Sequence, residues 1–237
     1  MVGDAEATRK RLLDAATAEF AGYGIAGARV DRIAEQARAN KAQIYHYFGS
    51  KDALFDAVFD AIVVNTVREV PIDPTDLPEY AGRLYDGYED HPEILRIATW
   101  YRLERADTTS LLDVIVQSNR HKVAAIDAAQ RAGRLTTRWS AADLLGLVLT
   151  VAGMWSTMTP EFTVLFSQHS RAQRRKVITD AVATLLADPA AAGADSAEPD
   201  PADPAVPDPA DPAVPDPDDP AVPDGAGQDR FAEGMAG

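Results

Sequence analysis

The chain changes character abruptly near residue 188, and this break confines any folded core to the residues before it. Beyond it lie 11 of the 16 prolines, and the octapeptide DPAVPDPA recurs with small changes over residues 203–226. Proline at this density removes backbone donors and prevents helix, while the acidic charges repel one another. We therefore predict a disordered tail over residues 188–237. We favour a tail whose only role is to keep the protein solvated. The alternatives are a strand that binds a partner protein and an acidic arm that mimics DNA.

The acidic charge of the chain is concentrated in this tail. The 237 residues have a net charge of −14, and residues 188–237 contain 13 Asp or Glu against one Arg. Residues 1–187 are left with a net charge of only −2. Local patches rather than the overall charge then decide what the folded part attracts, so a polyanionic partner is not excluded.

Several chemistries are excluded by what the sequence lacks. No cysteine is present, which rules out disulfides, thiolate metal sites and cysteine nucleophiles. The four histidines are scattered without ligand spacing, so no metal or cofactor is expected. Phosphate loops, glycine-rich dinucleotide turns and the G-x-S-x-G motif do not occur, which argues against an enzyme.

Membrane insertion and secretion are also not expected. The N-terminus is charged within four residues and has no apolar signal core. The longest apolar stretch, residues 144–155, is far shorter than the roughly 20 residues that a spanning helix needs. A cytoplasmic protein is the expectation.

Apolar residues recur at helical spacing throughout residues 1–187, and no convincing strand pattern appears. The sequence therefore predicts an all-α fold. Three prolines within residues 70–78 predict a boundary between a unit at 5–66 and a second unit at 67–187. The predicted helices are 5–21, 30–37, 41–48, 51–67, 79–89, 92–106, 108–132, 140–157, 160–168 and 171–187.

The predicted helix at 41–48 carries three aromatic-type side chains in a row, Tyr45, His46 and Tyr47. Successive helical residues point about 100° apart, so this short helix cannot bury all three. Ile44 and Phe48 fall at i and i+4 and suit the inner face. The outer face then combines small, amide, aromatic and basic side chains, which suits a DNA groove. It is typical of the second helix of a helix-turn-helix.

Three stretches occur here in a known order and spacing, namely TRKRLLDAATAEFAGYG, VDRIAEQA and IYHYFGSKDALFDAV. Through them, residues 8–62 resemble the N-terminal domain of TetR-type (tetracycline-repressor-like) transcriptional regulators. The resemblance implies a three-helix unit with a helix-turn-helix, whose reading helix enters the major groove. Two such units sit in a homodimer about one DNA turn apart, on double-stranded DNA with a palindromic operator.

The resemblance also implies roles for single residues. Ala42 and Gln43 match base-facing positions, because Ala can contact a thymine methyl group and Gln can bind adenine. Lys51 matches a phosphate-binding lysine, and the basic residues near it are further phosphate candidates. The expected DNA-binding residues are Arg29, Arg38, Lys41, Ala42, Gln43, Tyr45, His46, Tyr47 and Lys51.

The sequence departs from the family pattern at two places. Arg29 stands where the family commonly has a threonine N-cap, and an arginine cannot cap in that way. Arg38, Ala39 and Asn40 replace the usual Gly-Val-Ser of the turn. The glycine serves a left-handed conformation that costs another residue about 1 kcal/mol, so we expect strain at this turn. Asn40 suits the N-cap of the reading helix.

The second unit is expected to bind a small-molecule effector and to dimerise, as the resemblance implies. Dimerisation would use a four-helix bundle of the last two long helices of each subunit, with Arg171, Arg174, Arg175 and Lys176 on a solvated side. The expected interface residues are Leu144, Leu145, Val148, Leu149, Val151, Ala152, Val177, Ile178, Ala181, Val182 and Leu185.

An aromatic cavity with a few polar groups is expected to hold the effector, although an ordinary core position is the alternative for each residue. The candidates are Tyr85, Tyr88, Trp100, Tyr101, Gln117, His121, Trp155, Met158, Phe162 and Phe166.

Two functions remain open at this point. The first is a repressor that an effector releases from its operator. The second is an effector-independent adaptor or activator that acts through partner proteins and the tail. A cavity in the second unit favours the first function, and a filled core favours the second.

Overall fold

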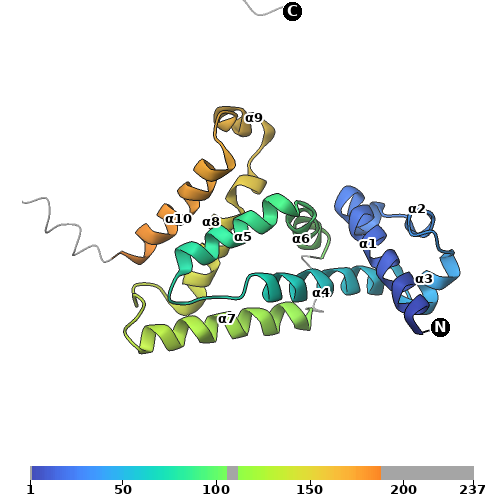
Figure 1. Cartoon of the computed structure of the whole chain (residues 1–237), viewed down its shortest axis with the longest axis horizontal. Helices are drawn as coiled ribbons and strands as arrows, with labels where there is room; N and C mark the ends of the chain where they lie inside the picture. The colour runs from blue at the N-terminus through green and yellow to red at the C-terminus, as the bar shows by residue number, and fades with distance from the viewer. Residues whose placement is uncertain (1, 106–111, 188–237) are drawn as a thin grey trace, which may run out of the picture. The chain divides into compact units, whose positions relative to one another are not determined.

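The computed structural model describes residues 2–105 and 112–187, which lie within one compact unit (Figure 1). Within these ranges the chain is helical and contains no strand, which confirms the predicted all-α class. The tail at 188–237 and the start of the helix predicted at 108–132 lie outside the described residues.

Four helices form the N-terminal part: α1 (Val2–Gly27), α2 (Val30–Gln36), α3 (Lys41–Phe48) and α4 (Lys51–Glu69). The first is longer than predicted, since it continues through Gly22 and is interrupted only at Gly24, where φ is 72°. Glycine tolerates this left-handed conformation, which allows the chain to change direction there.

A first hydrophobic cluster holds α1 to α4 together. Phe20 of α1 meets Phe55 of α4 edge to face at 5.2 Å, and Ile33 and Ile44 bring in α2 and α3. All four side chains are fully buried. Full burial of one such side chain stabilises the fold by roughly 1.5–3 kcal/mol, so this small cluster suffices to fix the four helices.

The remaining helices are α5 (Leu77–Asp90), α6 (Glu93–Glu104), α7 (Asp113–Arg131), α8 (Ala141–Thr157), α9 (Pro160–Thr163), the 3₁₀ turn η1 (Val164–Phe166) and α10 (Arg171–Leu186). The helix predicted at 160–168 is therefore two short pieces. Side-chain caps explain the starts of several helices, including Ser140 for α8 and Ser170 for α10.

A second hydrophobic cluster joins α5, α7, α8 and α10. Its fully buried members include Tyr80 of α5, Ile126 of α7, Val148 of α8 and Ile178 of α10. By contrast α6 contributes Ile97 to the first cluster. Thus α6, which follows residue 66 in the chain, packs on the first cluster.

Among the described helices, none is by itself long and apolar enough to cross a membrane. By length and composition alone, α8 and the α9–η1 segment together are long and apolar enough, but they form a pair bent by 87°.

Candidate nucleic-acid interface and ligand cavity

The outer face of α3 presents Tyr45 and His46 to solvent, as the sequence predicts. Tyr45 is 45% exposed and Ile44 on the inner face is fully buried. Tyr47 differs from the expectation, since it is half-buried and packs against the first hydrophobic cluster. Its ring packs edge to face against that of His46, with the ring centroids 5.4 Å apart.

The first turn of α3 is closed by a reciprocal capping box. The Asn40 side chain accepts a hydrogen bond from the Gln43 backbone N–H at 2.8 Å, and Gln43 Oε1 accepts one from the Asn40 N–H at 3.0 Å. Asn40 is thus the N-cap that the sequence predicts. The amide oxygen of Gln43 is occupied in this arrangement, which leaves its NH₂ group to donate outward.

Both predicted phosphate-binding lysines, Lys41 and Lys51, have partners within the protein. Lys41 lies 3.1 Å from the Asp31 carboxylate of α2. Lys51 Nζ donates to the carbonyl oxygens of Ala26 at 3.2 Å and Ala28 at 3.3 Å, where α1 ends. A substitution of Lys51 therefore removes contacts inside the protein as well as any contact with DNA.

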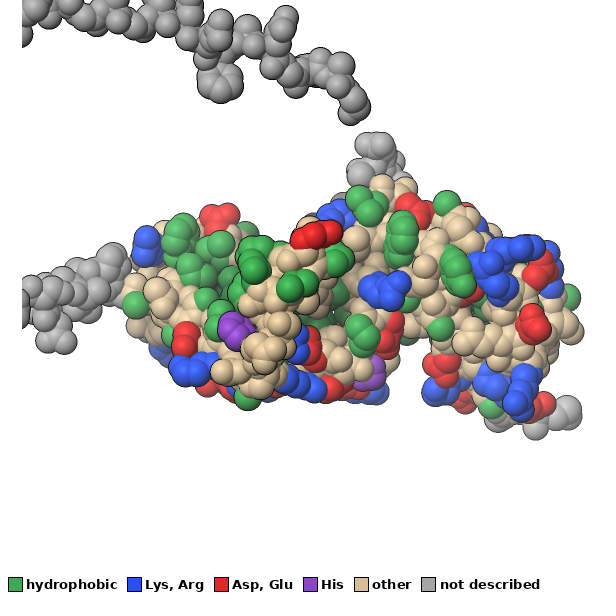
Figure 2. Space-filling view, turned by 90° about the horizontal axis from the view of Figure 1, so that it is seen from above, with side chains coloured by type: hydrophobic (Ala, Val, Ile, Leu, Met, Phe, Trp, Pro, Cys, Tyr) green, Lys and Arg blue, Asp and Glu red, His purple; other side chains and the backbone are tan. Residues whose placement is uncertain are grey.

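Arg29 and Arg38 are exposed, and so is Ala42 at the start of α3. Figure 2 shows Lys and Arg side chains gathered on the end of the molecule formed by α1 to α3. Glutamate and aspartate side chains also occur there, but α3 itself contains none. The cationic groups can therefore attract phosphate locally although the chain as a whole is acidic.

Glu19 of α1 binds the backbone at the start of α2, where Arg29 makes no side-chain cap. Its carboxylate accepts hydrogen bonds from the Arg29 backbone N–H and from Arg32 Nε, both at 2.8 Å. Burial opposes the ionised form, but the hydrogen bonds from Arg32 and Arg29 outweigh it and hold the pKa of Glu19 below its ordinary value. The Arg32 guanidinium also lies over the Tyr23 ring at 4.1 Å. This pair, in which Glu19 is buried and Arg32 is partly exposed, joins α2 to α1.

The turn between α2 and α3 keeps the left-handed conformation without a glycine. Arg38 has a φ of 52° and is the only non-glycine residue with positive φ in the described ranges. Arg11 of α1 braces the turn, because its Nε donates to the Ala37 carbonyl oxygen at 3.3 Å. The strained, left-handed conformation that the sequence predicts is therefore present at Arg38.

The C-terminal end of α6 binds the interruption in α1, a contact that sequence reasoning missed. Glu104 accepts hydrogen bonds from the backbone N–H groups of Ile25 at 3.0 Å and Ala26 at 2.7 Å. A Cβ at Gly24 would collide with Glu104 and would lie 2.9 Å from the Trp100 ring. The partners are almost eighty residues apart, and no local sequence signal joins them.

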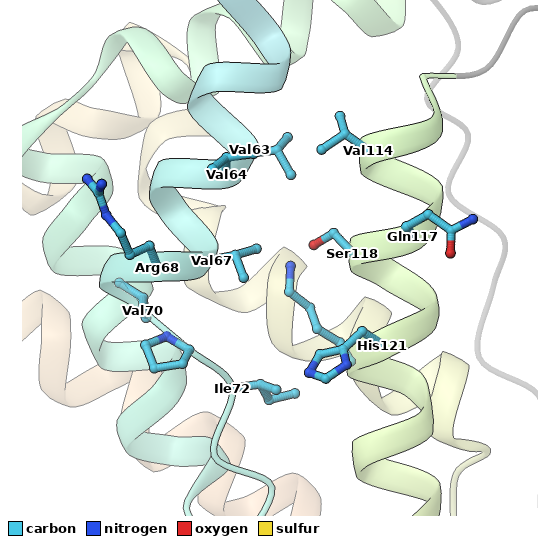
Figure 3. A pocket seen from close by; sticks show the side chains of 12 residues that line it. Val63, Val64, Val67, Arg68, Val70, Ile72, Val114, Gln117, Ser118 and His121 are labelled. Atoms are coloured by element: carbon cyan, nitrogen blue, oxygen red, sulfur yellow. The ribbon is translucent and has the colours of Figure 1, made fainter.

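A cavity of about 390 Å³ opens between α4, the α4–α5 connection and α7 (Figure 3). Val63 and Val67 of α4 point toward Val114 and Ser118 of α7 across it. Its volume falls within the range of small-molecule sites. The lining residues are Val63, Val64, Val67, Arg68, Val70, Pro71, Ile72, Val114, Gln117, Ser118, His121 and Lys122.

Only Gln117 and His121 of the ten expected pocket residues line this cavity, and the Gln117 amide points away from it (Figure 3). The sequence predicts aromatic walls, whereas the cavity has mostly aliphatic ones. The valines of α4 that line it have the spacing of any buried helix face, so the sequence does not distinguish them from core residues.

The other expected pocket residues lie away from this cavity, most of them in packed regions, while Phe162 is 43% exposed. Tyr85 is 1% exposed in the second cluster, where Tyr88 is half-buried and its pKa is raised to about 12 by burial. Trp100 donates to the Ala21 carbonyl oxygen, and Tyr101 stacks parallel to Phe55. The remaining four lie where α8 meets the α9–η1 segment, three of them in one aromatic group, and they are Trp155, Met158, Phe162 and Phe166.

The expected dimer residues divide into two groups. One group is buried within a single subunit and forms its core rather than a surface: Leu144, Leu145, Val148, Ala152, Ile178 and Val182. The other group remains at least partly exposed on α8 and α10: Leu149, Val151, Val177, Ala181 and Leu185. Figure 2 looks down on α9 and α10 and shows hydrophobic side chains gathered over them. The surface there also includes Val164 and Leu165, which are 68% and 70% exposed.

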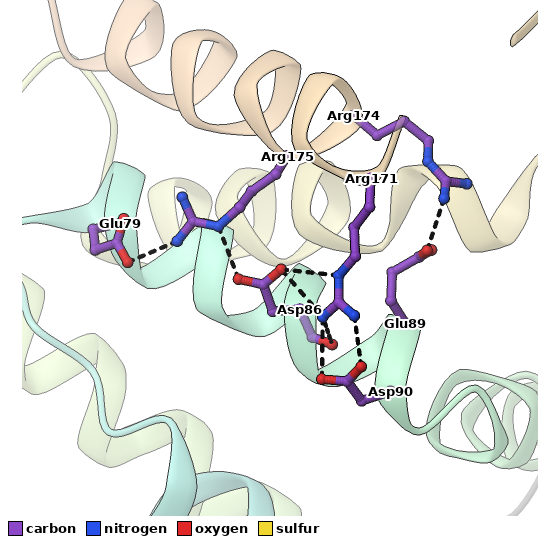
Figure 4. A network of polar contacts seen from close by, with 7 residues as sticks. All are labelled: Glu79, Asp86, Glu89, Asp90, Arg171, Arg174 and Arg175. Carbon is purple, nitrogen blue, oxygen red and sulfur yellow. Dashed lines mark hydrogen bonds and ion pairs between the residues drawn. The ribbon is translucent and has the colours of Figure 1, made fainter. Parts of the chain in front are cut away.

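The arginines of α10 are not simply solvated, which corrects the sequence expectation (Figure 4). Arg171 lies 2.6 Å from Asp90, and Arg174 lies 2.8 Å from Glu89. Arg175 binds Asp86 at 2.8 Å and also reaches the neighbouring Glu79 at 2.7 Å. Only Lys176 follows the expectation, since it is exposed and pairs within its own helix.

Two family models match the chain. Residues 12–58 match the model of bacterial regulatory proteins of the tetR family, and residues 76–183 match that of the tetracyclin repressor-like C-terminal domain. The HTH-type transcriptional repressor SCO4008 of Streptomyces coelicolor is 42% identical over 161 residues, which are 67% of this chain and 82% of that protein. The HTH-type transcriptional repressor NicS of Pseudomonas putida is 36% identical over 39% of this chain and 47% of its own length.

A solved structure agrees with these sequence matches. The crystal structure of SCO4942 from Streptomyces coelicolor has a TM-score of 0.68 and 38% identity, and the match covers 77% of this chain and 99% of that one. Regulators of this family bind DNA and act as dimers. The chain therefore belongs to the TetR family of bacterial transcriptional regulators, and it is a DNA-binding regulator of the repressor type.

Proposed function

We propose that two copies of this chain bind a palindromic operator in the cytoplasm and leave it when a small molecule occupies the cavity between α4 and α7. Each subunit inserts α3 into one major groove, where Tyr45, His46 and the NH₂ group of Gln43 face DNA. Partly exposed residues of α8 and α10, including Val177 and Leu185, form the contact between subunits.

One observation carries this proposal, namely that a single helix joins both sites. The first residue of α4, Lys51, bonds to the end of α1, and residues in its last turns, Val63 and Val67, line the cavity. A ligand that binds more tightly when α4 is displaced changes the spacing of the two reading helices. This coupling requires unequal affinity of the ligand for the two states.

The cavity also bears on the alternative of an effector-independent adaptor or activator. A protein that works only through partners has no need of an open space in its second part. A cavity with mostly aliphatic walls and a few polar groups is the usual form of a small-molecule site. This supports the sensor over the adaptor.

The test is a selection of bound fragments from the source organism's DNA, with the full chain and with its Tyr45→Ala variant. We expect the full chain to recover a palindrome and the variant to bind it at least about 1 kcal/mol more weakly, which corresponds to one lost contact. Tyr45 is exposed, so its removal leaves the fold intact. Recovery of the same fragments with equal affinity by the variant would contradict the placement of α3.

A further inference from the structure

One side of the cavity between α4 and α7 carries positive charge. Its lining includes His121 and Lys122 of α7, and no acidic residue of the described ranges lines it. Arg68 also borders it, but its guanidinium points away on the far side of α4 and pairs with Glu69 (Figure 3). The other walls are aliphatic, from Val63 and Val67 on one side to Val114 on the other (Figure 3). A site of this kind offers one cationic region and one hydrocarbon region to its ligand.

Lys122 is a partly buried cation of the cavity lining. It is largely shielded from solvent, and burial lowers its pKa, while no charged neighbour contributes to that shift. Within the described residues it forms no ion pair or hydrogen bond, unlike Lys41, Lys51 and Lys176. An unpaired, desolvated ammonium group is costly, and an anionic ligand would offset that cost.

Ser118 provides a second, independent sign of a missing partner. Its hydroxyl is buried and has no hydrogen-bond partner in the described part of the chain. Serines within helices commonly bond to the carbonyl four residues earlier, as the threonines at 17 and 99 do here. The Ser118 hydroxyl instead points toward α4 across the cavity (Figure 3). It can donate one hydrogen bond to an oxygen atom bound there.

We propose that this cavity binds an amphipathic anion, with a carboxylate head paired with Lys122 and hydrogen-bonded by Ser118, and a hydrocarbon part against the valines of α4 and α7. Ser118 and Lys122 are four residues apart in α7. Their hydroxyl and ammonium groups therefore lie on the same face of that helix. The identity of this ligand as an effector rests on the proposed function, but its binding does not.

The test uses the full chain and three probes that share one chain and differ in head-group charge: octanoate, octanol and octyltrimethylammonium. Binding is measured by calorimetry for the wild type, for Lys122→Met and Ser118→Ala, and for the control Lys176→Met. Lys176 is an exposed lysine of α10 that does not line the cavity. Methionine keeps the length and the apolar contacts of lysine, so Lys122→Met is expected to remain folded.

We expect octanoate to bind the wild type at least about tenfold more tightly than octanol, and octyltrimethylammonium to bind most weakly. Lys122→Met should reduce the octanoate affinity to that of octanol and leave octanol binding unchanged. Ser118→Ala should weaken octanoate binding severalfold, and Lys176→Met should have no effect. Octanoate binding that is absent, equal to that of octanol, or insensitive to Lys122→Met would overturn the proposal.

Release of DNA is measured separately, on the selected palindrome. If octanoate binds with the expected head-group order but does not release the DNA, the ligand class holds and the proposed regulation fails. If octyltrimethylammonium alone releases the DNA, the regulation holds and the ligand class is wrong.

Discussion

At the scale of a residue, Arg38 is held in a backbone conformation that suits glycine. Its φ is 52°, and the left-handed region costs a residue with a Cβ roughly 1–2 kcal/mol. Arg38→Gly removes this cost but frees the unfolded chain, so we expect a gain of about 0.5–1 kcal/mol in the free energy of unfolding. Urea denaturation measures the gain.

Arg38→Ala is the matched control, because it removes the same charge and keeps the Cβ. We expect no increase in stability for this variant, and equal losses of operator affinity for both variants if Arg38 contacts phosphate. An alanine variant as stable as the glycine variant would show that side-chain charge, and not backbone strain, sets the stability of this turn.

Gln43 allows the capping and DNA-contact roles of one residue to be separated. Glutamate also completes a capping box and is favourable at a helix N-terminus, so Gln43→Glu should leave the melting temperature unchanged or raise it. It removes the NH₂ donor and places a negative charge toward the phosphates. We expect operator affinity to fall by at least about tenfold. An unchanged affinity would remove Gln43 from the reading surface.

Through Glu19, the stability of the DNA-binding part is expected to depend on pH. Its folded pKa is held below the ordinary glutamate value of 4.5, so its contribution to stability is complete above that value. The contribution is lost as the pH falls from there through the lowered pKa of the folded state. Urea unfolding of the wild type and of Glu19→Gln between about pH 6 and about pH 3 measures this.

The Glu19→Gln variant should be less stable by about 2 kcal/mol near neutral pH, since it removes a charged acceptor from Arg32 and Arg29. The two proteins should converge in stability as the pH falls. Parallel pH profiles would mean that another carboxylate carries the effect.

At the scale of an element, the ion pairs between α5 and α10 join helices that are remote in sequence. Asp86 binds both Arg171 and Arg175, which makes it the centre of this network (Figure 4). We expect Asp86→Asn to lower the free energy of unfolding by about 1–2 kcal/mol, and the loss to shrink in high salt. Chemical denaturation at two salt concentrations measures both.

Asp180→Asn is the control for this prediction. Asp180 pairs with Lys176 within α10, and both side chains are more than half exposed. Exposed pairs of this type contribute about 0.2–1 kcal/mol. Equal effects of the two substitutions would show that the network adds nothing beyond single surface pairs.

The helices themselves could largely be predicted from sequence, because apolar periodicity, caps and glycines are local signals. Asn40 and Ser140 mark helix starts that the structure retains. The outward side chains of α3 followed from the same geometry. Tyr47 did not, because its half-buried position depends on how α3 packs against the first cluster.

Contacts between distant elements could not be predicted. Glu104 reaches the backbone of α1, and Arg175 passes close to Gly82, where an added Cβ would lie 2.8 Å from its guanidinium carbon. The cavity likewise arises from a gap between α4 and α7, and the valines around it resemble core residues in the sequence. A ligand site with aliphatic walls has no periodicity that separates it from a hydrophobic core.

At the scale of the whole molecule, the acidic repeat tail is expected to be dispensable for folding. Residues 188–237 carry most of the net charge, and Phe231 and Met235 are their only large apolar residues besides three valines, too few for a core. A chain that ends at Ala187 should therefore keep the melting temperature of the full chain, measured by calorimetry at the same dimer concentration. A lower melting temperature would contradict the disordered tail that the sequence predicts.

The central claim is that two α3 helices of one dimer read adjacent major grooves. Hydroxyl-radical footprinting of the full chain on its selected DNA tests it most directly. We expect two protected half-sites related by twofold symmetry and separated by about one helical turn, and we expect Tyr45→Ala to need at least about fivefold more protein for the same protection. A single asymmetric footprint, or equal protection by Tyr45→Ala at the same protein concentration, would contradict the account.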